Sequence, residues 1–262
     1  MEAPVVHAQE GGHWYSAEGR PVYEVPRSDG NGMRPATLRD ARKMGLFPGT
    51  TTVIRCADRP GLTNWMVDQG ILAALTLPRL KDEPEAAWLR RVKQDSKEQA
   101  RKAAERGTAI HAAIQDGFEG APVPEEYLPH RQAACSVLFN WNSFPDWHWW
   151  AEKSFSHGLG FGGKVDLHCS GFVCDFKTKE FGPDDDLKTW DEHAMQLAAY
   201  REGLKMPNAR AAVCYVSVSH PGVARLIEIE PSELERGWEC FKSLLSFWQA
   251  KNRYWPEMKK AA

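Results

Sequence analysis

The sequence predicts an α/β fold, with a mixed β-sheet flanked by helices and an additional helical region before it. Two observations predict this class. Apolar residues recur with helical spacing through residues 60–144, whereas short alternating runs replace them from residue 149. The later elements then follow the order three strands, helix, two strands, helix. That order is typical of a mixed sheet with helices packed on it.

The composition is that of a soluble globular protein. The chain has 262 residues, 42% of them hydrophobic and 26% charged, and its net charge is −2. Contacts with a nucleic acid would therefore come from local basic patches rather than from overall attraction. We predict a single domain over 1–262, made of an N-terminal arm (1–45), a helical region (46–145) and an α/β core (146–262).

The cysteines and the N-terminal segment indicate a reducing compartment. The six cysteines form no Cys-x-x-Cys pair, so neither a structural zinc site nor an iron–sulfur cluster is expected. The first 16 residues contain no apolar signal segment, and no run of about 18 apolar residues occurs. We therefore expect a cytoplasmic protein with no membrane span.

The elements before the core are expected to be mainly helical. The Gly-rich segment within 1–45 is typical of a short hairpin or an extended arm. After a Pro-Gly turn, Thr51 or Thr52 is a candidate cap for a short helix. Further helices are expected over 60–77, 83–117 and 125–144.

The core elements are expected in quick succession. Strands are predicted over 149–157, 161–169, 172–180, 209–220 and 223–230, with helices over 187–204 and 231–255. Ser232 followed by Glu235 has the form of a capping pair at the start of the last helix.

The stretch 160–179 has the form of a β-hairpin with acidic residues on one face. A two-residue turn at 170–171 would place Asp166 opposite Asp175. Directly opposed side chains share a sheet face, with Cβ atoms about 4.5–5.5 Å apart. The intervening residues are apolar, so the other face is expected to pack on a core: Val165, Leu167, Cys174 and Phe176.

Two opposed carboxylates destabilise a hairpin unless a cation lies between them, and divalent cations prefer carboxylate oxygens. Lys177 is two residues beyond Asp175 and points to the same face, with Lys164 expected opposite it. Two acids with one lysine form a site suited to phosphodiester cleavage. The alternative is a surface strand pair with a solvated charged face.

Other candidate residues lie outside this hairpin. His111 is one helical turn after Gly107, whose place inside a helix suggests close approach of another backbone. Gln196 and Tyr200 share a helix face with His193 and could contact phosphate or sugar oxygens. Each of these residues also has a purely structural interpretation, as a helix histidine or a polar helix edge.

A basic run precedes His111 in the long helix. It is Arg90, Arg91, Lys93, Lys97, Arg101, Lys102 and Arg106, interrupted by Asp95, Glu98 and Glu105. Such a run is usually a solvated helix face, and contact with DNA phosphates is the alternative interpretation.

Taken together, these elements resemble the PD-(D/E)xK nuclease superfamily, and more narrowly its RecB-like branch. The resemblance rests on Gly107-Thr108 with His111, Glu152, Asp166, Asp175-Phe176-Lys177-Thr178, and Gln196 with Tyr200, in this order. The segments PGTTTVIRC and GLTNW also resemble phage-encoded relatives of the mitochondrial genome maintenance exonuclease, with Gly49-Thr50-Thr51 departing from the usual pattern.

The resemblance implies a restriction-endonuclease-like core and a Mg²⁺- or Mn²⁺-dependent deoxyribonuclease without an iron–sulfur cluster. The metal ligands would be His111, Asp166, Asp175 and the carbonyl of Phe176. The catalytic residues would be Asp166, Asp175, Lys177 and Glu152, with Lys177 orienting the attacking water. DNA contacts are predicted for Gln196, Tyr200, Thr51, Thr52, Arg101, Lys102, Arg106, Thr178 and Lys179.

The resulting hypothesis is an exonuclease acting on single-stranded DNA ends in phage replication or recombination, in the cytoplasm of a bacterial host. A single-strand binding or annealing protein would be a reasonable partner. The alternatives are a duplex-resecting recombination exonuclease, a structure-specific endonuclease and a non-catalytic DNA-binding module.

Overall fold

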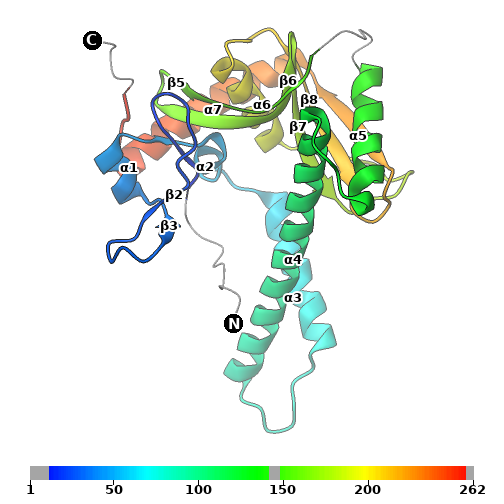
Figure 1. Cartoon of the computed structure of the whole chain (residues 1–262). Coiled ribbons are helices and arrows are strands. Elements are labelled where there is room, and N and C mark those ends of the chain that lie inside the picture. Colours follow the sequence, from blue (N-terminus) through cyan, green and yellow to red (C-terminus); the bar gives the residue numbers. More distant parts are fainter. Residues whose placement is uncertain (1–11, 142–147, 258–262) are drawn as a thin grey trace.

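The computed structural model describes residues 12–141 and 148–257 and is built around a five-stranded mixed sheet (Figure 1). The strands are β5 (Trp150–His157), β6 (Phe161–Cys169), β7 (Phe172–Lys179), β8 (Arg210–Ser217) and β9 (Ala224–Ile229), in that spatial order. All neighbours are antiparallel except β7 and β8. The predicted α/β class with a mixed sheet is confirmed.

The parallel pair follows from the helix between its strands. Parallel neighbours need a crossover connection, and α6 (Asp191–Gly203) provides it between β7 and β8. The last helix, α7 (Pro231–Asn252), packs against α6. It begins at Pro231, as the sequence predicts, because proline suits the first turn of a helix. No side-chain cap bond forms at its start, so the predicted capping pair of Ser232 and Glu235 does not act as a cap.

The sheet separates two hydrophobic clusters. On one side, Val173 and Val213 pack with α6, α7 and the N-terminal elements. On the other, Cys174 and Phe176 pack with α4 (Glu85–Glu119) and α5 (Leu128–Trp141), together with Leu167. Val165 belongs to the first cluster, so the predicted single apolar face of the hairpin is wrong at that residue.

The N-terminal elements pack on the core. They are β1 (Trp14–Tyr15), β2 (Glu24–Pro26), β3 (Met33–Pro35), α1 (Leu38–Met44), β4 (Phe47–Pro48) and α2 (Thr50–Ile54). The predicted hairpin in this segment is only an isolated bridge from Tyr15 to Pro21, because β1 pairs with β4. The helix α2 already begins at Thr50, so Thr51 and Thr52 lie inside it and are not its cap.

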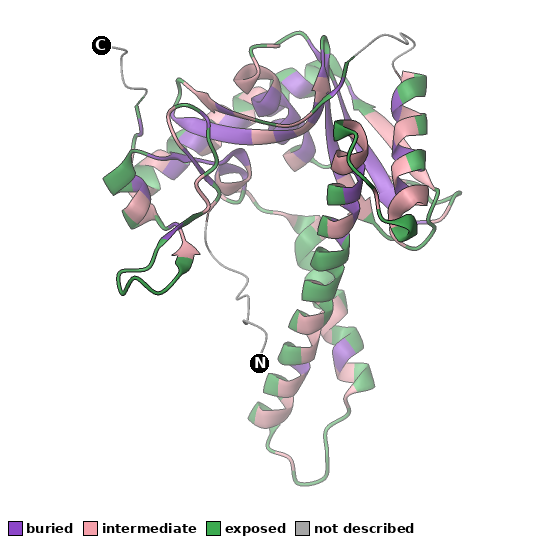
Figure 2. Ribbon diagram, in the orientation of Figure 1, coloured by how far each residue is buried: buried purple, intermediate pink, exposed green. Residues whose placement is uncertain are grey.

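A helical arm projects from this core (Figure 1). It consists of α3 (Pro60–Thr76) packed against the first half of α4, while the second half of α4 returns to the sheet and buries Ile110 and Ile114. Figure 2 shows buried residues concentrated in the sheet and α6, with much of the arm exposed. The helix expected over 125–144 is a short 3-10 turn (Glu125–Tyr127) followed by α5, and 142–144 lie outside the described residues.

No helix among the described residues is long and apolar enough to cross a membrane. All six cysteines lie among the described residues, and none of them forms a disulfide.

Candidate active site

The candidate site lies where β6 and β7 separate. Their pairing joins Leu167 to Cys174 and Cys169 to Phe172, which is the register predicted from a turn at 170–171. The ladder stops there, and Asp166 replaces a backbone partner: its Oδ2 accepts a hydrogen bond of 2.8 Å from the Phe176 amide.

This separation corrects two predicted cross-strand pairs. Asp166 was expected opposite Asp175, and Lys164 opposite Lys177. The β6–β7 ladder ends at Leu167 and Cys174, beyond which β6 pairs only with β5 while β7 continues along β8. Neither the two acids nor the two lysines therefore form a directly opposed pair. The carboxylate of Asp166 fills the opening between the diverging strands, which an unbroken ladder would have closed.

Asp175 is the most enclosed of the candidate catalytic groups, with 2% of its surface exposed. Its Oδ1 accepts a hydrogen bond of 2.8 Å from Gln196 Nε2, and its Oδ2 is in ion-pair contact with Lys177 Nζ. Lys177 Nζ also donates to Gln196 Oε1 over 3.2 Å. The three side chains thus form a closed polar triangle.

The helix α6 supplies the outer part of this network. Gln196 and Tyr200 are four residues apart and therefore lie on one helix face. Gln196 Nε2 donates to the Tyr200 hydroxyl over 2.8 Å, and both side chains are buried. Because α6 follows β7 directly in the parallel crossover, it places these polar groups over Asp175.

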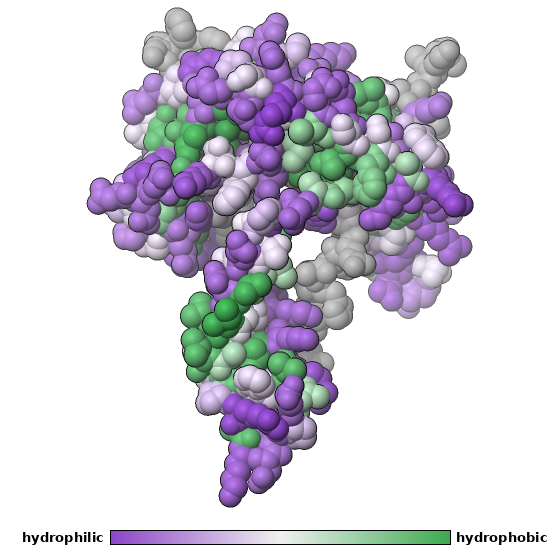
Figure 3. Space-filling view, turned by 180° about the vertical axis from the view of Figure 1, so that it is seen from behind, coloured by the Kyte–Doolittle hydropathy of each residue, from purple (hydrophilic) through white to green (hydrophobic). Residues whose placement is uncertain are grey.

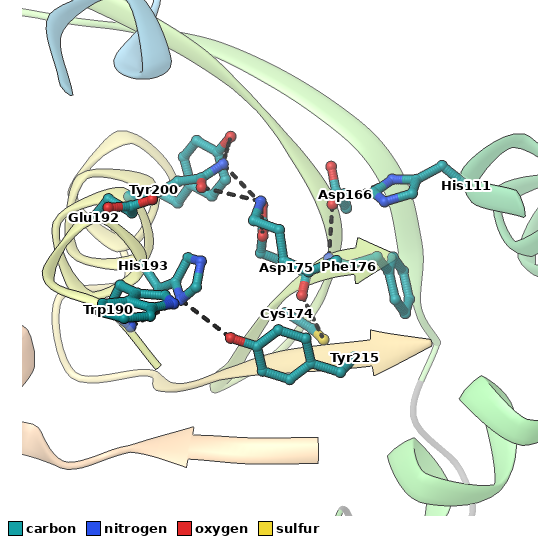
Figure 4. A network of polar contacts seen from close by, with 12 residues as sticks. His111, Asp166, Cys174, Asp175, Phe176, Trp190, Glu192, His193, Tyr200 and Tyr215 are labelled. Carbon is teal, nitrogen blue, oxygen red and sulfur yellow. Dashed lines mark hydrogen bonds and ion pairs between the residues drawn. The ribbon is translucent and has the colours of Figure 1, made fainter. Parts of the chain in front are cut away.

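His111 approaches from the opposite side, on α4 (Figure 4). Its Nδ1 lies 3.8 Å from Asp166 Oδ2, and its ring makes a hydrogen bond with the Phe176 backbone. In a strand, the amide and carbonyl of one residue point to the same edge. The carbonyl of Phe176 therefore faces the same opening as Asp166.

A close helix–strand contact brings His111 to this position. A Cβ at Gly107 would lie 2.6 Å from Thr178 Oγ1 on β7, so α4 approaches the sheet more closely than alanine would allow. The close approach predicted from this glycine is confirmed, although the neighbour is a side chain rather than a backbone.

The electrostatics disfavour a negative charge on both carboxylates at once. Burial, and then the negative charge of Asp175, raise the pKa of Asp166 above its ordinary value. Burial lowers the pKa of Lys177, but attraction by Asp175 and Asp166 outweighs it, so the net shift is upward and the ammonium is retained. Burial lowers the pKa of His111, which favours a neutral imidazole.

These donors are suited to a divalent cation. Within the described ranges, no three His, Cys, Asp or Glu side chains converge closely enough to enclose a metal ion as they stand. The donor chemistry nevertheless fits, because two carboxylates and a carbonyl are the oxygens that Mg²⁺ and Mn²⁺ prefer. Asp175 Oδ2 is buried, and its partner among the described residues is the Lys177 ammonium.

Glu152 lies beside this group in an unusual backbone conformation. Its φ is 54°, a left-handed value that is uncommon for a residue other than glycine. The β5–β6 ladder is interrupted at this residue, where Asp166 would be its partner. Its carboxylate is in ion-pair contact with Lys164 rather than with Lys177.

The predicted DNA-binding residues fall into two groups. Gln196, Tyr200 and Thr178 lie in or next to the site, and Lys179 is exposed at the end of β7. The others lie farther out: Thr51 and Thr52 on α2, and Arg101, Lys102 and Arg106 on the exposed side of α4.

Three of these outer residues already have partners. Arg106 donates to the carbonyl of Val218 over 2.8 Å, and Arg101 forms ion pairs with Glu98 and Glu105. The Thr52 hydroxyl accepts a hydrogen bond of 3.0 Å from the His13 amide. At about 1.5 Å per residue, Arg101 lies about 15 Å along α4 from His111. Lys102 is exposed.

Several neighbours of the site were not predicted as site residues. His193 accepts a hydrogen bond of 3.1 Å from the Trp190 amide and contacts the Tyr215 hydroxyl at 3.3 Å. Burial lowers the pKa of His193 to about 4, with Lys177 as the next cause. Arg59 forms an ion pair of 3.3 Å with Glu192 at the start of α6. His193 could have been predicted from the sequence, because it shares a helix face with Gln196. No sequence pattern indicated Arg59.

Comparisons with known proteins give only distant similarity. No family model and no curated protein matches this chain. A protein from Eubacterium rectale, provisionally assigned as an exonuclease, has a TM-score of 0.41 and 11% identity over 56% of this chain and 68% of its own. The protein SSO0001 has a TM-score of 0.29 and 16% identity over 70% and 86% of the two chains. At these values neither similarity bears on function.

Proposed function

We propose that this protein is a metal-dependent deoxyribonuclease that removes nucleotides from the ends of single-stranded DNA. The observation that carries the proposal is the meeting of Asp166, Asp175 and Lys177 where β6 leaves β7. Phosphodiester hydrolysis needs stabilisation of a negatively charged transition state and a positioned water. Paired acidic groups for a cation, with one ammonium beside them, meet both needs.

The protein groups have distinct roles in this proposal. His111, Asp166, Asp175 and the Phe176 carbonyl would hold Mg²⁺ or Mn²⁺, which supplies Lewis-acid stabilisation of the phosphate and a more acidic bound water. Lys177 orients that water and offsets charge on the phosphate. Gln196 keeps the Lys177 ammonium near Asp175 by accepting its hydrogen bond.

Glu152 and Tyr200 act at the edges of the site. Glu152 would position the Lys164 ammonium near Asp166 through their ion pair, which as a whole adds no net charge to the acidic site. The Tyr200 hydroxyl stays protonated, because burial and then Asp175 raise its pKa well above the ordinary value. It can therefore donate to a phosphate or sugar oxygen.

The path of the DNA is proposed from the exposed basic residues. Lys179 at the end of β7, Thr178 beside it and Arg106 on α4 would contact the nucleotides nearest the scissile bond. Lys102 and Arg101 would contact phosphates farther along the arm, with Thr51 and Thr52 on the opposite side. A single strand that enters this path by its end would be shortened from that end. This is the exonuclease action that we propose for phage replication or recombination. Its partner would be a single-strand binding or annealing protein of the bacterial cytoplasm.

Digestion of end-labelled DNA tests this function. Linear single-stranded and double-stranded DNA would be incubated with Mg²⁺, with Mn²⁺ and with EDTA, alongside circular single-stranded DNA. The proposal expects progressive shortening of linear single strands in either metal, none in EDTA, and intact circles. Cleaved circles would indicate an endonuclease, and preference for duplex ends a recombination exonuclease. DNA that is bound but never cut would indicate a non-catalytic module.

A further inference from the structure

The helix α3 exposes an apolar surface on the projecting arm (Figure 3). Seven of the 17 large hydrophobic residues that are exposed in the described chain lie on this one helix. The α3 surface is defined here by Trp65, Met66, Val67, Ile71, Leu72 and Leu75, whose exposed fractions run from 38% to 73%. A monomer rarely leaves so many large apolar side chains together in water.

The composition of α3 is that of a buried helix. Between Pro60 and Pro78 the only charged residue is Asp68. A helix that is apolar on all sides is normally covered on all sides. Here α4 covers one side, and Ala73 is the only residue of α3 classed as buried.

The arm is a well-bonded hairpin, so this exposure does not come from an unfolded tip. Trp88 Nε1 on α4 donates to the Leu77 carbonyl over 2.7 Å, just after α3 ends. Arg91 bonds Glu83 over 2.9 Å and the Pro78 carbonyl over 3.0 Å. These contacts tie the connection to α4 and hold the α3 surface outward.

The residue types on the α3 surface indicate which kind of partner would bind it. A DNA strand would need cationic contacts for its phosphates, and no Lys or Arg occurs between Pro60 and Pro78. Helices that lie on membranes also carry a Lys- and Arg-rich polar face. A surface that is apolar and nearly uncharged is complementary to a copy of itself.

The exposed apolar area of the α3 surface is about what one partner buries in a stable dimer. A stable interface buries about 800 Å² per partner, and in homodimers about 65% of it is apolar, or roughly 500 Å². Six large side chains, most of them about half exposed, supply an apolar area of that order. Because the arm projects from the core (Figure 1), two copies can meet along it while the sheets stay apart.

We propose that the α3 surface is a self-association interface through which two copies of this protein pair α3 against α3. The contact would be isologous, with the same residues buried on both copies. It would leave the Asp166 and Asp175 sites of both copies open, and it does not depend on what those sites catalyse.

Sedimentation or light scattering of the full chain tests this proposal. The expected mass is about 59 kDa, twice the 29.5 kDa of one chain, falling toward one chain on dilution. The double variant Ile71→Glu with Leu75→Glu should have the mass of one chain and an unchanged melting temperature. The matched control is Phe247→Glu on α7, which is as exposed as Ile71 at 53% and should keep the double mass.

A mixing experiment identifies the contact itself. A second double variant, Ile71→Lys with Leu75→Lys, should also be a single chain when alone. Mixed with the glutamate variant it should form a pair, because opposite charges then face each other across α3. A wild-type protein that stays a single chain at all concentrations would overturn the proposal. So would a glutamate variant that still pairs, or a mixture that does not.

Discussion

The Lys177 ammonium lies beside Asp175 and Asp166 and offsets part of their negative charge. It contacts Asp175 Oδ2 and donates to Gln196, and its pKa remains raised although it lies in a largely enclosed place. The ammonium therefore stabilises the buried Asp175 carboxylate, and a cation bound as proposed would compete with it for the same oxygen. A substitution of Lys177 should therefore affect catalysis and metal affinity in different ways.

Lys177→Ala should lower kcat by about 100- to 1,000-fold, the loss usually seen when one preorganised charge-stabilising group is removed. Affinity for Mn²⁺ should stay the same or increase, because the ammonium no longer competes for Asp175. Single-turnover cleavage and titration with Mn²⁺ measure the two quantities separately. Rates near those of the wild type would show that Lys177 has no role in catalysis.

At this scale, the sequence identifies the acids, the lysine and the α6 residues, because alternation along a strand and spacing along a helix fix which side chains share a face. Asp166, Asp175 and Lys177, with Gln196 and Tyr200, are brought together as expected. The pairing of Glu152 with Lys164 was not foreseen, because it depends on a left-handed backbone residue inside a strand.

At the scale of elements, the position of α4 against β7 determines whether His111 reaches the site. The contact is made where Gly107 lies against Thr178, one helical turn before His111. Alanine would gain about 1 kcal/mol of helix propensity over glycine. An added methyl group in a tight contact costs about 1–3 kcal/mol, so the clash should dominate.

Gly107→Ala should therefore lower the free energy of unfolding by about 1 kcal/mol. In a Thr178→Ala background the same change should instead raise it by about 1 kcal/mol, since the clashing oxygen is gone. Urea denaturation of the four proteins in this double-mutant cycle measures both values. Equal effects in the two backgrounds would mean that Gly107 and Thr178 do not limit the approach of α4.

The first turn of α1 provides a pH-dependent test. Arg34 binds Asp40 through two hydrogen bonds of 2.7 and 2.8 Å, and Thr37 adds others. Arg34 first, and then Thr37, hold the pKa of Asp40 well below its usual range. A lowered folded-state pKa stabilises the fold above the unfolded value of about 3.9, and this stabilisation is lost as pH falls toward the folded value.

Asp40→Asn should lower the melting temperature at pH 7, and the difference from the wild type should shrink below about pH 4. Thermal unfolding across a pH series measures it, with Asp29→Asn as the control. Asp29 contacts Arg27 through an exposed ion pair of 3.7 Å, and an asparagine oxygen can still accept the hydrogen bond that the Asn31 amide donates. A difference that is absent at pH 7, or that stays constant into acid, would contradict the assignment.

The order and type of the main elements could be predicted because each has a clear spacing of apolar residues and is bounded by glycine, proline or other turn residues. The separation of β6 from β7 could not, since it depends on a side chain, Asp166, replacing a backbone partner. The start of α2 at Thr50 was also missed, because Gly49 and not a threonine precedes the helix.

On the scale of the whole molecule, the core and the arm have different surfaces. The core buries clusters on both sides of the sheet, and the site opens between them. The arm carries the apolar α3 surface and an exposed basic stretch of α4, where Arg101 is tied to Glu98 and Glu105 while Lys102 is exposed. The proposed DNA path therefore depends more on Lys102 than on Arg101.

Lys102→Gln should flatten the salt dependence of single-stranded DNA binding by about 0.7 in the log–log slope, the value for one lost phosphate contact. Arg101→Gln should change the slope less, because its charge is already shared with two glutamates. Binding titrations across a salt series measure these slopes, with Lys43→Gln on α1 as the control. An unchanged slope in the Lys102 variant would remove this part of α4 from the DNA path.

Asp175 is the residue on which the proposed metal-dependent nuclease centre depends most. The most direct test of its role is the cleavage rate of end-labelled single-stranded DNA in Mg²⁺ by Asp175→Asn, compared with the wild type and with exposed Asp184→Asn. We predict a loss of at least about 100-fold in the Asp175 variant alone, with DNA binding and melting temperature retained. An Asp175→Asn protein that is folded, binds DNA and cuts it at the wild-type rate would contradict this claim.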